Sequence, residues 1–153
     1  MKLVDNLQMK SSPTAEGTTR TVIDTDGNIY QGGTQVTATA AELNAYAITV
    51  YMADANTAGS IFVVAPHAGN IIGMYATNYV ANTTTKTVLT AEIAGVLVTA
   101  PAWEIAVTQA AGDASSSVPT AANAVTAGQV IEIVSDGAGA PVMPMMVTLL
   151  ISR

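Results

Sequence analysis

Residues 144–152 read PMMVTLLIS and determine the fold class of this chain. Side chains alternate between the two faces of a β-strand, so Met145, Val147, Leu149 and Ile151 share one face. Met146 and Leu150 lie on the opposite face, which makes this strand apolar on both sides. Such a strand either lies centrally under a cover, or its outer face meets another subunit.

Shorter runs rich in β-branched and apolar residues precede this strand from residue 48 onward. They are separated by Gly, Pro, Asn and Ser, and they span residues 48–52, 61–65, 70–80, 87–93, 96–98, 103–107 and 129–135. Ala94-Gly95 predicts a hairpin, and residues 110–128 read as a long polar loop. About seven short strands with turn signals between them predict an all-β fold, an antiparallel jelly-roll-like β-sandwich.

Two of these runs also predict which side chains share a face. In residues 70–80, Ile72, Met74, Ala76 and Val80 fall on one face by strict alternation. In residues 103–107, the shared face is that of Trp103, Ile105 and Val107.

Residues 1–46 have a different character and predict an N-terminal arm ahead of a β-sandwich domain at residues 47–153. The first twenty positions show no period of 2 or 3.6, which is typical of an extended segment. Asp26-Gly27 lies between two short β-prone runs and predicts a hairpin. The capping box Thr39-Ala40-Ala41-Glu42 predicts one short helix that runs to about Ala47.

Composition argues against several classes of function. The chain has 153 residues, no cysteine, one histidine and 10% charged residues, with a net charge of −6. No catalytic triad, metal site or cofactor-binding loop can be read from it, so we expect a protein that is not an enzyme, with no catalytic residues, no metal and no cofactor. Glu92, Glu104 and Glu132 are spread singly, with no spacing that indicates a catalytic pair.

The same features restrict the partners and the compartment. The negative net charge argues against nucleic acid, and the lack of an 18-residue apolar window argues against a membrane. The first residues lack the apolar region of a signal peptide, so synthesis in the cytoplasm is expected.

An apolar chain with so few charges is predicted to bury surface in a homo-oligomer. The candidate subunit-interface residues are a loop histidine and strand residues with apolar or aromatic side chains: His67, Tyr75, Tyr79, Met146 and Leu150. Tyr75, Thr77 and Tyr79 share a face, and tyrosines with Trp103 can also stack sugars, so a glycan is the alternative partner of a Tyr/Trp face.

Several short motifs resemble structural proteins of tailed bacteriophages. Residues 27–34 (GNIYQGGT) and 36–44 (VTATAAELN) resemble a module common near the start of such proteins. Residues 68–73 (AGNIIG), 111–113 (AGD), 119–123 (PTAAN) and 127–132 (AGQVIE) are similar to small phage β-sandwich proteins, which include capsid decoration (cementing) proteins and fibre domains.

This resemblance implies a virion protein that assembles as a homotrimer on the capsid surface. The expected function is to bind the major capsid protein from outside and stabilise the shell by bridging its subunits, after synthesis in the host cytoplasm. A head- or tail-fibre or adhesin component and a carbohydrate-binding module are the alternatives. In the leading hypothesis the arm binds the capsid through the residues Lys2, Lys10, Arg20, Val22, Ile23, Ile29 and Tyr30.

Overall fold

The structure is a computed structural model that describes residues 21–23, 29–31, 34–35 and 44–152. The chain divides into two units, Met1–Thr39 and Ala40–Arg153. The described part of the first unit is an antiparallel sheet of β1 (Thr21–Ile23), β2 (Ile29–Gln31) and β3 (Thr34–Gln35). Strands β1 and β2 pair antiparallel as the predicted hairpin requires, and its turn, residues 24–28, lies outside the described residues.

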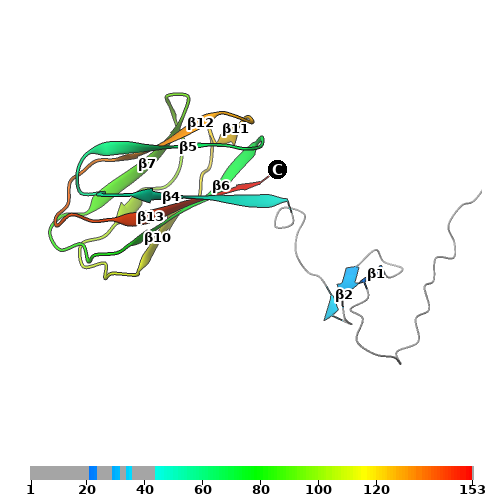
Figure 1. Cartoon of the computed structure of the whole chain (residues 1–153), viewed down its shortest axis with the longest axis horizontal. Coiled ribbons are helices and arrows are strands. Elements are labelled where there is room, and N and C mark those ends of the chain that lie inside the picture. Colours follow the sequence, from blue (N-terminus) through cyan, green and yellow to red (C-terminus); the bar gives the residue numbers. More distant parts are fainter. Residues whose placement is uncertain (1–20, 24–28, 32–33, 36–43, 153) are drawn as a thin grey trace, which may run out of the picture. The chain divides into compact units, whose positions relative to one another are not determined.

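The second unit is built from two antiparallel five-stranded sheets (Figure 1). In the first sheet the order is β10-β6-β13-β4, and β11 also pairs with β6. In the second the order is β5-β12-β7-β8, and β9 also pairs with β7. The strands are β4 (Ala45–Met52), β5 (Gly59–Val64), β6 (Gly69–Asn78), β7 (Thr87–Ile93), β8 (Val96–Leu97), β9 (Trp103–Ile105), β10 (Ala114–Ser117), β11 (Ala124–Val125), β12 (Val130–Ser135) and β13 (Met145–Ser152).

The described residues contain no helix, so the all-β prediction is confirmed. Residues 39–43 of the predicted helix lie outside the described residues. The remainder of that prediction is wrong, because Ala45 to Ala47 form the start of β4. The sandwich-like unit thus has its first strand two residues ahead of the boundary expected at residue 47.

The core lies between the two sheets and is centred on β13. This strand lies between β6 and β4, and its inward side chains Met145, Val147, Leu149 and Ile151 are fully buried. Burial of one such side chain stabilises the fold by about 1.5–3 kcal/mol. The outward side chains of Met146 and Leu150 are only half-buried. The strand is therefore central within its sheet, and the described residues place no cover over its outer face.

A β-bulge in β6 makes the predicted face of residues 70–80 wrong at Ile72, while Met74 and Ala76 are buried on one side as predicted. Leu150 pairs with Gly73, whereas the next residue of β13, Ile151, pairs with Ile71. The extra residue, Ile72, shifts the alternation by one, because a bulge places two residues opposite one. Ile71 is fully buried in its place, with Met74 and Ala76 on the same side, and Ile72 is half-buried.

The connections follow the turn signals in part. Ala94 and Gly95 both have positive φ, 51° and 77°, as a two-residue type I′ hairpin turn requires, so the predicted hairpin between β7 and β8 is confirmed. The predicted loop at residues 110–128 contains β10 and β11. Val107 is 38% exposed, because β9 ends at Ile105 and the alternation predicted for Trp103, Ile105 and Val107 stops there.

Candidate interaction surfaces

The first candidate surface is the outer face of the sheet that contains β13. Alternation places the outward residues of β4, β13 and β6 side by side, in register across the three strands. We call this surface the tyrosine face and define it by Thr49, Tyr51, Tyr75, Thr77, Met146, Thr148 and Leu150.

Side-chain contacts hold the tyrosine face in order. The hydroxyls of Thr49 and Thr148 share a hydrogen bond, with 3.0 Å between the two Oγ1 atoms. The ring of Tyr51 stacks on Tyr79 at the edge of the face, with centroids 6.4 Å apart and planes 28° apart. The ring of Tyr75 lies over Gly73, where any Cβ would come within 2.7 Å of it. Glycine lets the ring lie flat there, and a larger residue would make the Tyr75 ring shift.

This surface is uncharged and partly apolar. None of the five strands of this sheet contains an Asp, Glu, Lys or Arg residue. Tyr51 is 51% exposed and Tyr75 is 41% exposed, beside the half-buried Met146 and Leu150. Tyrosine and methionine are enriched in protein interfaces, and charged residues are depleted at their centres. The tyrosine face therefore has the composition of an interface core.

Four of the five residues predicted for a subunit interface meet on this surface. Tyr75, Met146 and Leu150 belong to the tyrosine face, and Tyr79 adjoins it through Tyr51. His67 is exposed and lies elsewhere, at the end of the sheet where β4 begins. Its backbone oxygen accepts a hydrogen bond of 2.6 Å from the Tyr46 hydroxyl, and its ring makes an edge contact with Tyr46 at 5.8 Å.

The second candidate surface is the outer face of the other sheet. Its exposed apolar side chains surround two carboxylates that occupy neighbouring strands. We call it the glutamate face and define it by Phe62, Val64, Glu92, Leu97, Val130 and Glu132. Glu132 of β12 pairs with Phe62 of β5 on one side and with Glu92 of β7 on the other.

Sequence reasoning missed the glutamate face. Residues 61–65 are all apolar, so alternation cannot tell their inward from their outward members. The structure buries Val63 and leaves Phe62 62% exposed. The proximity of Glu92 and Glu132, 40 positions apart, depends on the register of β7 with β12, and no local pattern encodes it.

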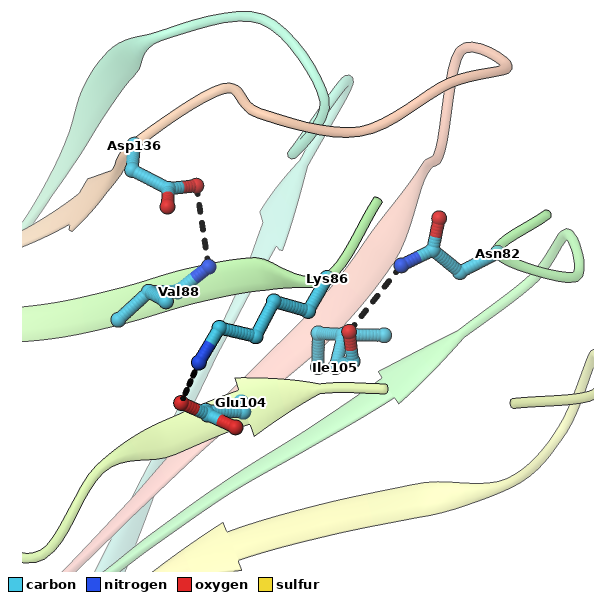
Figure 2. Close-up of polar contacts among 6 residues, drawn as sticks. All are labelled: Asn82, Lys86, Val88, Glu104, Ile105 and Asp136. Atoms are coloured by element: carbon cyan, nitrogen blue, oxygen red, sulfur yellow. Dashed lines mark hydrogen bonds and ion pairs between the residues drawn. The ribbon is translucent and has the colours of Figure 1, made fainter. Parts of the chain in front are cut away.

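Among the described residues, the one basic side chain near this sheet is already engaged in an ion pair. Lys86 is the only lysine or arginine in the part of the chain that the structure describes. Its Nζ lies 2.6 Å from Oε1 of Glu104, on β9 (Figure 2). In the same region the Val88 backbone N–H donates to Oδ1 of Asp136 at 3.0 Å, which fixes the end of β12 beside β7 (Figure 2).

A pocket beside Trp103 lacks side chains that could act as an acid, a base or a metal ligand. Its lining comes from β7, residues 97–103 and Met74, and none of those side chains is ionisable. Trp103 itself is only 1% exposed, so it cannot serve as a sugar-stacking platform, and the expected Tyr/Trp glycan face is left with its tyrosines. Within the described ranges, no group of three His, Asp or Glu side chains is placed to hold a metal ion.

The predicted capsid-binding residues fall in the first unit. Val22 and Ile23 lie in β1, while Ile29 and Tyr30 lie in β2, with Val22 paired to Tyr30. Lys2, Lys10 and Arg20 lie outside the described residues. Their role in binding stays a prediction.

No protein-family model, curated protein or solved structure matches this chain. In the described part of the chain, no helix is long and apolar enough to cross a membrane.

Proposed function

We propose that this chain is a structural virion protein that binds the outside of a phage capsid as a homo-oligomer, a trimer in our hypothesis. Each oligomer would bridge neighbouring subunits of the major capsid protein. A ligand that binds only the assembled shell stabilises that shell by mass action. Three linked sites also raise the effective concentration at each contact, so modest individual affinities suffice.

The observation that carries the proposal is the uncharged tyrosine face. A chain with a net charge of −6 repels its own copies, and this repulsion is weakest where a whole sheet has no charged residue. Association through this face would bring Tyr75, Met146 and Leu150 out of water. The composition thus favours contact between identical copies over contact with a charged ligand.

The strand order supports a jelly-roll version of the sandwich. The first long strand, β4, and the last, β13, are neighbours in one sheet, while β5 and β12 are neighbours in the other. Such wrapping of paired strands is the connectivity of jelly rolls, an architecture used by viral capsid domains. This likeness is one of architecture, so it raises the expectation of a virion role without assigning a partner.

The alternative to capsid attachment is a fibre or adhesin role that binds glycans. The exposed Tyr51–Tyr79 stack is the one observation that favours it, because tyrosine rings can stack on sugar faces. A glycan array with the wild-type protein and with the Tyr51→Ala variant tests this reading directly. A sugar bound by the first and lost by the second would favour the adhesin role over decoration.

Self-association is tested by light scattering coupled to size exclusion. We expect the wild type to have about three times the chain mass of 15.5 kDa. Leu150→Lys places a charge on the tyrosine face and should shift the protein toward the monomer. Val142→Lys, at an exposed loop position, is the matched control and should leave the mass unchanged. A wild-type monomer at micromolar concentration contradicts the proposal.

Attachment is tested by co-sedimentation with purified capsids that lack the protein. Saturable binding at a fixed ratio to the capsid subunits, together with a higher temperature of shell disruption, is the expected result. If the oligomeric wild type neither sediments with the shells nor raises that temperature, the decoration role is wrong.

A further inference from the structure

In the part of the chain that the structure describes, strand β5 is an edge strand of its sheet. Among the residues that the structure describes, β5 pairs on one side only, with β12. The Ala65 N–H donates to the Gln129 oxygen at 2.9 Å, which places Ala65 in a hydrogen-bonded pair. Hydrogen-bonded and non-hydrogen-bonded residues alternate along an antiparallel strand. The N–H and C=O groups of Ser60, Phe62 and Val64 therefore point away from β12, toward the open side.

This edge lacks the usual protection. Natural proteins block edge strands with a charged residue, a proline or a bulge. Strand β5 reads GSIFVV, and its register with β12 is continuous from Gly59 to Val64. Phe62 and Val64 are 62% and 57% exposed on the outer face beside the edge. The edge can therefore accept another strand with its backbone, and an apolar contact lies next to it.

The carboxylates of Glu132 and Glu92, beside the β5 edge, favour an added strand that carries a basic residue. Phe62, Glu132 and Glu92 form one row across β5, β12 and β7. Phe62 and Glu132 are a non-hydrogen-bonded pair, in which side chains come closest, with Cα atoms about 4.5 Å apart. Like charges directly opposite each other, as in Glu92 and Glu132, destabilise a sheet. Lys86, the one lysine or arginine of the described part, is paired with Glu104.

We infer that the β5 edge binds an extended segment of a partner protein by strand addition, with a lysine or arginine of that segment opposite Phe62. Neighbouring strands lie about 4.8 Å apart, so this residue is two strands from Glu132, about 10 Å between Cα atoms. A long basic side chain spans that distance together with the glutamate. Its cation then lies over the Phe62 ring and meets the Glu132 carboxylate.

The β5 strand of a second copy fits the edge less well. Two β5 strands can pair, but β5 contains no basic residue that could meet Glu132. The edge strands β4 and β10 belong to the uncharged sheet, so no charge there selects a particular partner. The inference deepens the proposed function and rests on it in one respect: the shell would supply the basic segment.

The first test uses a blocked peptide, Thr-Val-Thr-Arg-Thr-Val-Thr, titrated into the full-length protein and followed by amide NMR. We expect saturable shifts that are largest at Ser60, Phe62 and Val64, and amide exchange slowed at least tenfold there. The same peptide with glutamate in place of arginine should bind at least tenfold more weakly. Equal binding of both peptides, no binding at millimolar concentration, or shifts centred on β4 would overturn the inference.

Variants of the protein test separately the backbone pairing at the β5 edge and the contribution of the Glu132 charge. Phe62→Lys places a lysine in the edge strand and should abolish peptide binding. Glu132→Gln should keep strand addition but reduce the preference for arginine to about twofold or less. Glu104→Gln, on the same sheet, is the matched control and should leave both affinities unchanged. If Glu132→Gln retains the full preference, or if amide shifts at Phe62 depend on protein concentration without peptide, the inference is wrong.

Capsid binding then distinguishes this inference from the proposed function. If the wild type binds the peptide but no capsids, the decoration role fails and the strand-addition site stands. If wild type and Phe62→Lys bind capsids equally well, attachment uses another surface and the inference as a capsid contact fails, while the decoration role stands.

Discussion

Asp54 and Met143 are joined by a hydrogen bond across 89 positions of the chain: the Met143 N–H donates to Oδ1 of Asp54 at 2.9 Å. The same carboxylate accepts the N–H of Asn56 at 2.9 Å and the hydroxyl of Thr57 at 2.6 Å. Asp54 thus ties the connection between β4 and β5 to the segment that enters β13. Both connections leave the same end of the core.

These bonds predict an acid-sensitive contribution to stability. The Thr57 hydroxyl, followed by the Met143 N–H, lowers the pKa of Asp54 from its ordinary value of 3.8. The folded state therefore binds this proton less readily than the unfolded state. The stabilisation is complete above the ordinary value and is lost as the pH falls through it toward the lower folded pKa.

The Asp54→Asn variant measures that contribution. We expect the free energy of unfolding at pH 7 to fall by about 1 kcal/mol, which is below the ~1.5–3 kcal/mol typical of bonds to a charged acceptor because the group is partly in water. The difference from wild type should shrink below about pH 4 in urea titrations. Glu104→Gln, which removes the exposed pair with Lys86, is the control. A difference that stays constant down to pH 2 would contradict the assigned cause.

A second prediction concerns the loss of stability when Gly137 is replaced by alanine, which would create a steric clash. Its φ is +67°, and a Cβ there would lie 2.0 Å from the backbone nitrogen of Ala58. Gly128 also has a positive φ, +81°, but its Cβ would meet nothing within 4 Å. Gly128→Ala should cost about 1–2 kcal/mol from the left-handed backbone alone. Gly137→Ala should cost a further ~1–3 kcal/mol, because the two backbones must separate.

Chemical denaturation of both variants at one pH checks this comparison. Equal losses of stability in Gly137→Ala and Gly128→Ala would mean that the contact with Ala58 is relieved without cost.

A third prediction concerns the loss of stability when a charge is buried at the position of Asn82. Its side chain is fully buried, and Nδ2 donates to the backbone oxygen of Thr85 at 2.8 Å. The same Nδ2 donates to the backbone oxygen of Ile105 at 3.1 Å (Figure 2). Asn82→Asp replaces this donor with a carboxylate oxygen that faces two carbonyls. We expect a loss of about 3–5 kcal/mol at pH 7. The loss should be smaller near pH 4, where a protonated carboxyl can donate one of the two bonds.

The matched control is Asn123→Asp. Asn123 donates to the Ile71 oxygen at 2.8 Å but is only half-buried, so its new charge keeps contact with water. Thermal unfolding of the two variants at pH 4 and pH 7 separates the cases. A loss for Asn82→Asp that is no larger than that for Asn123→Asp would contradict the burial argument.

The sequence predicted those features that depend on local pattern. The strict alternation of β13 gave its inward residues correctly, and Ala94-Gly95 has the positive φ angles that its hairpin needs. The predicted helix was wrong where it extended to Ala47, because the helix-forming tendency of a few residues is weak against tertiary pairing. Ala45 to Ala47 gain more from the ladder with β13 than a two-turn helix would give them.

Features that depend on pairing between distant strands could not be predicted. The bulge at Ile72 arises where β6 and β13 shift register. Gly73 in the same run is a general signal of a bulge, but it does not say which residue is the extra one. The row of Phe62, Glu132 and Glu92 likewise exists only because three strands align. The tyrosine face was found in part, since Tyr75, Met146 and Leu150 could each be assigned an outward face from alternation within a single strand.

Leu149 and Leu150 are neighbours in β13 and allow folding and assembly to be tested separately. Leu149 is fully buried between the sheets, whereas Leu150 is half-buried on the tyrosine face. Leu149→Ala should lower the free energy of unfolding by about 2–5 kcal/mol, through lost transfer energy and a residual cavity. Leu150→Ala should cost less than Leu149→Ala in the isolated chain, because part of the Leu150 side chain stays in water after folding and its truncation leaves no enclosed cavity. For assembly of the proposed oligomer, Leu150→Ala should have the larger effect of the two and raise the dissociation constant at least tenfold. Leu149→Ala should change the dissociation constant little as long as the chain is folded. Urea denaturation at low protein concentration and light scattering over a dilution series measure the two quantities. If Leu150→Ala associates as tightly as wild type, the copies do not meet at the tyrosine face. Another apolar surface of this chain must then form the subunit contact.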